Sequence, residues 1–163
     1  MKILGIVILV LMSMVSVLSA DTVSYHLPYL HTNTSAVTYC VANNSSSNTL
    51  TVSFTATATA NGASTNGATN SYGYVISGHT TRMFTFSGQV VYQNGPTDER
   101  VDLVVDTDPS ASYGGVLSFS STGTSGTLNC KNVMMSCFQG TTNPKRNLVG
   151  IICDDNTTAV YGF

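Results

Sequence analysis

The sequence predicts an all-β protein: a single-domain antiparallel β-sandwich or jelly roll of about eight strands. Short segments with an apolar residue at every second position recur along the chain after residue 20. Clusters of Gly, Asn and Ser separate these segments, as turns do. No segment has the i, i+3, i+4, i+7 apolar spacing of an amphipathic helix. Many short strands joined by turns favour two packed sheets.

The first twenty residues differ in composition from the rest of the chain. Lys2 is their single charge, an apolar run covers residues 3–18, and the small residues Ser19 and Ala20 follow. We predict a cleaved signal peptide over residues 1–20 and one β-sandwich domain over residues 21–163. The alternative is a retained membrane anchor, but the run is short of the roughly 20 residues that a spanning helix needs. The mature chain is then secreted (extracellular, cell-surface or periplasmic) and has no membrane span.

The first half of the mature chain contains five predicted strands. They cover residues 22–31, 35–42, 48–60 and two short pieces on either side of Gly78 within residues 74–88. The strand at residues 22–31 is placed at a sheet edge, because Pro28 cannot donate a ladder hydrogen bond. Residues 43–48 and 61–73 are rich in Asn, Ser and Gly, which predicts a turn and a flexible loop.

The second half contains further predicted strand segments, some of them short. They cover residues 89–93, 100–106, 113–121, 128–138, 148–153 and 158–163. Gly114 and Gly115 predict a β-bulge in the third of these. The order of the strands within the sheets does not follow from the sequence.

Three stretches between residues 25 and 87 resemble the small β-sandwich family typified by the sensory rhodopsin transducer. They are "YHLPYLH", "TYCVANNSSSNTLTVSF" and "GHTTRMFTF". In that family a strand ending in Asn, a short turn, an alternating strand and a strand of the form Gly/Ala-x-x-Thr/Arg follow one another. The resemblance implies a sandwich. It implies nothing about signalling, because an exported chain with disulfides departs from that cytoplasmic family.

One predicted strand alternates apolar and hydroxyl residues. In "NTLTVSFTATATANG", residues 48–62, Ser and Thr occupy the odd positions from residue 51 to residue 59. We predict a half-buried strand with Val52 and Phe54 in the core and the hydroxyls in solvent. The alternative is a flat hydroxyl array that binds ice or a crystalline polysaccharide. That array requires neighbouring strands to repeat the pattern, and residues 100–106 and 113–121 are not expected to do so.

The even number of cysteines predicts two disulfides in an exported chain. The four are Cys40, Cys130, Cys137 and Cys153. Three pairings are open, and we favour Cys130–Cys137, which closes a short loop, with Cys40–Cys153, which ties an early strand to a late one. No C-x-x-C pair is present to favour a metal site instead.

Charge restricts the possible partners. Only 9% of the residues are charged and the formal net charge is −2, so the clustered Lys and Arg of a nucleic-acid-binding surface are missing. Five of the eight acidic residues fall within residues 98–108. Among them Asp102, Asp106 and Asp108 are candidate ligands for a calcium cofactor, since calcium takes six to eight oxygen ligands. The alternative is a charged strand face followed by an Asp-rich turn.

Tyrosines are the candidate ligand-binding residues, and the chain contains no Trp. Four of them are predicted to stack on sugar rings, with core filling as the alternative role: Tyr72, Tyr74, Tyr92 and Tyr113. No nucleophile elbow accompanies the histidines and serines, so we expect no catalytic triad.

The sequence therefore predicts a secreted, non-catalytic protein that binds polysaccharide or a protein on a cell surface. The first alternative is a homo-oligomeric coat or fibre subunit that assembles by strand addition through its C-terminal strand. A third hypothesis is a small hydrolase that uses the carboxylates of Asp102 and Asp106.

Overall fold

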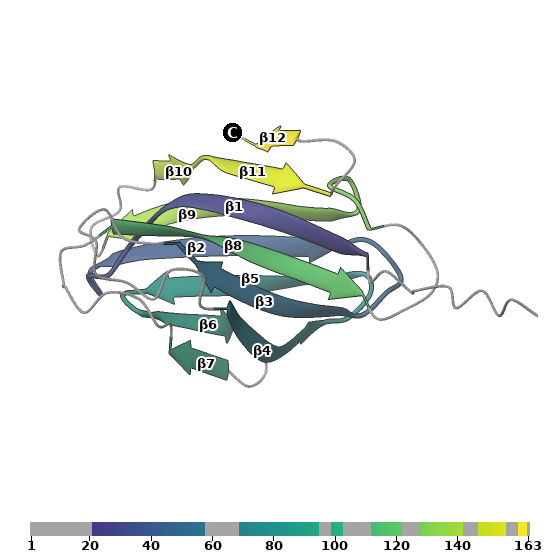
Figure 1. Ribbon diagram of the computed structural model, residues 1–163, viewed down its shortest axis with the longest axis horizontal. Coiled ribbons are helices and arrows are strands. Elements are labelled where there is room, and N and C mark those ends of the chain that lie inside the picture. Colours follow the sequence, from purple (N-terminus) through teal and green to yellow (C-terminus); the bar gives the residue numbers. More distant parts are fainter. Residues whose placement is uncertain are drawn as a thin grey trace, which may run out of the picture.

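The computed structural model describes residues 21–57, 69–94, 99–102, 112–121, 128–141, 147–155 and 160–162. Within these ranges the chain forms two six-stranded sheets in which every neighbouring pair is antiparallel. The predicted β-sandwich is confirmed (Figure 1). The described residues hold twelve strands rather than about eight, because several short strands extend the sheet edges.

Sheet A has the strand order β12-β11-β1-β8-β3-β4. Its strands are β1 (Thr22–His31), β3 (Leu50–Ala56), β4 (Thr69–Ile76), β8 (Ser112–Ser121), β11 (Ile151–Asp154) and β12 (Val160–Gly162). Sheet B has the order β10-β9-β2-β5-β6-β7. Its strands are β2 (Ala36–Asn44), β5 (Thr80–Ser87), β6 (Val90–Asn94), β7 (Glu99–Asp102), β9 (Val133–Thr141) and β10 (Asn147–Val149). In Figure 1, β10, β11 and β12 lie along one side of the molecule and β4 and β7 along the other.

One apolar core fills the space between the two sheets. The two-residue period of each strand sends alternate side chains inward, and aromatic rings from opposite sheets meet there. The Phe54 and Phe86 ring centroids lie 5.2 Å apart, and those of Phe84 and Phe119 lie 6.0 Å apart. Val52 and Phe54 are buried, as the alternation of β3 predicts.

The turns follow their local chemistry. Strands β4 and β5 flank Gly78, as predicted, and a Cβ on Gly78 would lie 2.5 Å from the carbonyl oxygen of Ser47. Gly88 begins the two-residue connection between β5 and β6 with a φ of 61°. Glycine adopts that left-handed backbone without steric cost, so its position specifies the hairpin.

The edge position predicted for β1 is wrong, because β1 lies between β11 and β8. Pro28 is tolerated there for two reasons. The pairing with β11 covers only Ser24 to His26, and the pairing with β8 shifts register between Leu27 and Leu30. The predicted bulge thus exists, but the extra residue belongs to β1, opposite Gly114.

The loop predicted over residues 61–73 is also corrected in part. Residues 69–73 belong to β4, which pairs with β3 through Ser53 and Ser71 among others. Residues 61–68 lie outside the described residues. The Asn and Gly content predicted a loop. Strand β3 supplies the backbone hydrogen-bonding partners that make residues 69–73 a strand, and composition does not reveal them.

All four cysteines form disulfides, as predicted, but the favoured pairing is wrong. The bonds are Cys40–Cys137 and Cys130–Cys153. Cys40 and Cys137 face each other directly in the register of β2 and β9. Cys130 precedes β9, and the extended chain from residue 133 to residue 137 alone spans about 13 Å. A disulfide needs Cα atoms within about 7 Å, and the directly paired Cys40 meets this at 4.1 Å, whereas the extended strand separates Cys137 from the turn that holds Cys130.

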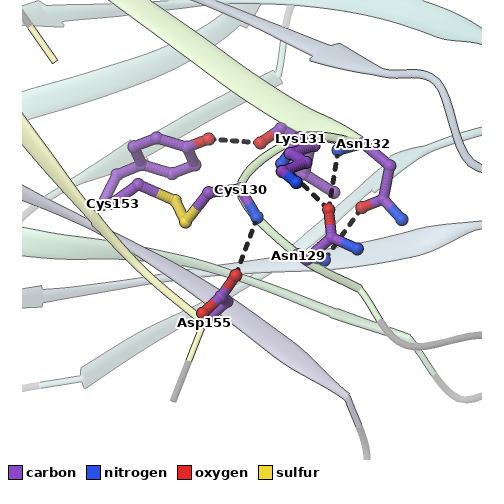
Figure 2. Close-up of a disulfide and its surroundings, with 8 residues drawn as sticks. Asn129, Cys130, Lys131, Asn132, Cys153 and Asp155 are labelled. Atoms are coloured by element: carbon purple, nitrogen blue, oxygen red, sulfur yellow. Dashed lines mark hydrogen bonds between the residues drawn. A yellow bond between two sulfur atoms is a disulfide. The ribbon is translucent and has the colours of Figure 1, made fainter. Parts of the chain in front are cut away.

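The Cys130–Cys153 bond ties β11 of sheet A to the turn that precedes β9 of sheet B (Figure 2). In that turn the Asn129 side-chain oxygen accepts hydrogen bonds from the backbone N–H groups of Lys131 and Asn132. The Asp155 carboxylate accepts one from the backbone N–H of Cys130 at 3.2 Å. This disulfide therefore joins the two sheets, whereas Cys40–Cys137 joins two strands of one sheet.

Two disulfides indicate an oxidising, extracellular environment. The predicted signal peptide, residues 1–20, lies outside the described residues and stays a prediction. Within the described ranges, no helix has the length and apolar character needed to cross a membrane.

Candidate functional site

The outward side of sheet A is rich in hydroxyl groups, and we call it the hydroxyl face. It consists of the outward residues of β1, β8 and β3: Thr22, Ser24, Thr51, Ser53, Thr55, Ser118 and Ser120. Their hydroxyls bond across the strands. Thr22 Oγ1 lies 2.9 Å from Ser120 Oγ, and Ser24 Oγ lies 3.0 Å from Ser118 Oγ.

The strand register builds these rows. Ser118 of β8 pairs with Ser24 of β1 on one side and with Ser53 of β3 on the other. Ser120 pairs in the same way with Thr22 and Thr51. The expectation that residues 113–121 do not repeat the hydroxyl pattern is therefore wrong. The apolar residues that hide the repeat, Leu117 and Phe119, point into the core.

The outward side of sheet B carries exposed aromatic and apolar side chains among polar ones, and we call it the aromatic face. A single cross-strand row crosses four neighbouring strands: Phe138 of β9, Tyr39 of β2, Thr85 of β5 and Tyr92 of β6. At about 4.8 Å per strand the row is about 14 Å long. Tyr39 and Phe138 are each 38% exposed, and Met134 of β9 is 49% exposed. Such an area of exposed apolar surface is typical of binding or assembly surfaces.

Tyr39 lies beside a glycine that gives its ring room. A Cβ on Gly140 of β9 would lie 2.9 Å from Cε2 and 3.5 Å from Cδ2 of Tyr39. The ring therefore covers the backbone of Gly140, next to its directly paired neighbour Phe138. This contact restricts the ring while leaving part of it in solvent, which lowers the entropy cost of stacking on a ligand.

The four tyrosines predicted to bind sugar have different positions. Tyr74 and Tyr113 are 2% and 3% exposed and belong to the core, which is the alternative role of core filling. The Tyr113 hydroxyl donates to the carbonyl oxygen of Gly88 at 2.9 Å, and burial raises its pKa. Tyr92 lies half-buried on the aromatic face. The side chain of Tyr72 lies outside what the structure describes.

The predicted calcium ligands are not tested by the structure. Asp102 ends β7, but its side chain is not described, and Asp106 and Asp108 lie outside the described residues. Among the described residues, no group of three or more His, Cys, Asp or Glu side chains is placed to hold a metal ion. The calcium site stays a prediction.

Sequence reasoning missed Tyr39 and Phe138 as candidate ligand-binding residues. The signal for Tyr39 was the cysteine beside it: an inward Cys40 forces Tyr39 outward by the two-residue period. The same argument applies to Cys137 and Phe138.

A scan against protein-family models and searches of curated proteins and of solved structures found no match. The resemblance of residues 25–87 to the transducer family therefore stays a prediction.

Proposed function

We propose that this protein is an exported, non-catalytic β-sandwich module that binds polysaccharide through its aromatic face. The row of Phe138, Tyr39 and Tyr92 is the observation that supports this proposal. Aromatic rings offer the large, stiff apolar surfaces that stack on the C–H faces of sugars. The row lies on strands rather than on loops, which holds its rings at fixed separations.

From Phe138 to Tyr92 the row holds no charged residue, and beyond Tyr92 the register continues to Arg100 of β7. Thr85 lies between Tyr39 and Tyr92 and supplies a hydroxyl. The neighbouring outward positions on β2 and β5 are Val41 and Met83, which carry no charge. A neutral polysaccharide that crosses the strands of sheet B would meet two adjacent rings, then Thr85, then a third ring.

The test is a pull-down on insoluble cellulose, chitin and starch, followed by a neutral glycan array. Tyr39→Ala is expected to lower retention about fivefold, because stacking of one ring contributes about 1 kcal/mol. Tyr29→Ala is the matched control, since Tyr29 is 40% exposed but belongs to β1 of sheet A. Equal losses in the two variants, or no retention of the unmodified chain on any polysaccharide, contradict the proposal.

A second candidate function is assembly by strand addition. Strand β12 (Val160–Gly162) occupies the end of the order of sheet A, a position from which a further strand can be added. Sedimentation over a hundredfold range of concentration tests this. Truncation after residue 155 should abolish any oligomer formed through β12, and a chain that stays monomeric throughout contradicts this second function. The hydrolase hypothesis stays a prediction, because the carboxylates of Asp102 and Asp106 are not described.

A further inference from the structure

A hollow of about 440 Å³ opens where the bulge of β1 faces β8 and the end of β3. We call it the Gly114 hollow. Its volume is in the range of small-molecule sites. The residues that matter for its chemistry are His26, Pro28, Thr57, Ser112, Gly114 and Val116.

Gly114 keeps the hollow open. A Cβ at this position would lie 2.9 Å from the carbonyl oxygen of Leu27 and 3.0 Å from Thr57 Oγ1. The wall beside it is held by a backbone hydrogen bond of 2.9 Å from the N–H of Thr57 to the carbonyl of Gly114. The bulge in β1 moves Pro28 out of regular register and so completes the opposite wall.

The polar groups around the hollow differ from those of the hydroxyl face. On that face the hydroxyls of Ser24 and Ser118 bond to each other. Around the hollow, the side chains of His26, Thr57 and Ser112 make no hydrogen bond to any residue that the structure describes. The hydrogen-bond donors and acceptors of these three side chains are therefore available to a ligand. A ligand gains more from such groups, because no hydrogen bond within the protein has to be broken first.

The lining also restricts the ligand's charge and shape. None of the described residues that line the hollow is Asp, Glu, Lys or Arg, so this lining suits a neutral ligand better than an ion. Pro28 and Val116 add two small apolar surfaces. Hydroxyls, an imidazole and apolar patches at close range match one sugar ring, which has hydroxyls at its rim and C–H groups on its faces.

We propose that the Gly114 hollow binds a single neutral sugar unit. This site belongs to strands of sheet A, and the aromatic face belongs to sheet B, so the two are independent. With both sites occupied, one domain bridges two saccharide chains, and where these belong to one polysaccharide particle the second binding event becomes intramolecular.

The test is a titration with glucose, galactose, mannose and N-acetylglucosamine, followed by NMR of the labelled protein. At least one sugar should shift the backbone amide signals of Gly114, Gly115 and Val116. Thr57→Val should weaken its binding about fivefold, the equivalent of one hydrogen bond of about 1 kcal/mol. Thr51→Val is the matched control on the same strand and face, and it should leave the affinity unchanged.

Two further variants separate the possible outcomes. Gly114→Ala should weaken binding, because its methyl group would crowd the Thr57 hydroxyl that the sugar uses. Thr57→Val keeps the test valid if Gly114→Ala disturbs the fold. Tyr39→Ala should leave the binding of the single sugar unchanged. If Tyr39→Ala removes it, if Thr57→Val and Thr51→Val bind equally, or if no sugar shifts these amides, the proposal is overturned. The proposal that the aromatic face binds polysaccharide is tested separately, by the pull-down with the Tyr39→Ala variant.

Discussion

The outer faces of the two sheets are built from the same kind of strand, yet they use their side chains differently. On the hydroxyl face, Ser24 and Ser118 bond across strands at 3.0 Å and so satisfy each other. On the aromatic face, Tyr39, Phe138 and Met134 keep more than a third of their surface exposed. Exposed apolar area is unfavourable in water, whereas bonded hydroxyls are not. Sheet A exposes apolar side chains too, at Tyr29, Val75 and Ile152, so the two faces differ in the pairing of their hydroxyls rather than in exposed apolar area alone.

The two sheets share one packing device. Phe54 of β3 lies diagonally opposite Gly115 of β8, where a Cβ would lie 2.1 Å from its ring. Tyr39 of β2 has the same relation to Gly140 of β9. Inside the sandwich the arrangement buries a ring completely, and outside it leaves part of a ring in solvent. In both cases a glycine makes space for an aromatic ring on the neighbouring strand.

The largest effect is expected from the disulfide beneath the aromatic face. Replacing Cys40 and Cys137 together by Ala should lower the free energy of unfolding by about 4.7 kcal/mol, from the chain-entropy relation for a separation of 97 residues. The same relation gives about 3.4 kcal/mol for Cys130 and Cys153, which are 23 residues apart. Urea unfolding measures both. A larger loss from the second pair would show that tying the sheets together matters more than loop length.

A somewhat smaller effect separates the two sides of β3. Phe54→Ala should cost about 3 to 5 kcal/mol, because the ring fills the core beside Gly115 and Phe86. Thr55→Ala and Thr57→Ala, on the outward side, should each change stability by no more than about 1 kcal/mol. Equal effects in thermal unfolding would mean that the hydroxyl face is covered in the native assembly.

High pH should lower the stability of the fold through two buried tyrosines of sheet A, Tyr25 and Tyr113. Burial, and then the Asp155 carboxylate, raise the pKa of Tyr25, against a smaller opposite effect of a backbone hydrogen bond from Met135. Burial raises the pKa of Tyr113. Above pH 10 the unfolded chain loses these protons while the folded chain keeps them, so stability falls as pH rises. Each tyrosine contributes up to about 1.4 kcal/mol per pH unit.

Urea unfolding at pH 9, 10 and 11 measures this loss. Tyr113→Phe should reduce the slope, since it removes one of the two ionisable groups. An unchanged slope in Tyr113→Phe contradicts the assignment.

The smallest effect concerns the hydroxyl rows. A double-mutant cycle with Ser24→Ala and Ser118→Ala should give a coupling energy of about 0.2 to 1 kcal/mol, as for other cross-strand hydroxyl pairs. The control is a cycle between Ser24 and Thr51, which lie on strands that do not pair. A Ser24–Ser118 coupling energy no larger than that of the control would show that these hydroxyls do not stabilise each other. The hydroxyl face would then not differ from the aromatic face in this respect.

Local pattern by itself determined much of this protein. The alternation in β3 predicted which side of the strand holds Val52 and Phe54, because the side-chain period of a strand is fixed by backbone geometry. Gly78 predicted the turn between β4 and β5, because the backbone of Ser47 comes too close there for a residue with a side chain. The even number of cysteines predicted two disulfides. None of these inferences needed to know which strands are neighbours.

Only the tertiary structure decided what depends on neighbours. Cys40 pairs with Cys137 because the register of β2 and β9 places them opposite each other across 97 residues of sequence. Ser118 joins a hydroxyl row because β8 inserts between β1 and β3. Tyr113 is buried because its hydroxyl reaches the β5–β6 turn of the other sheet. Long-range pairing depends on the sum of many contacts across the chain, and no local period encodes that sum.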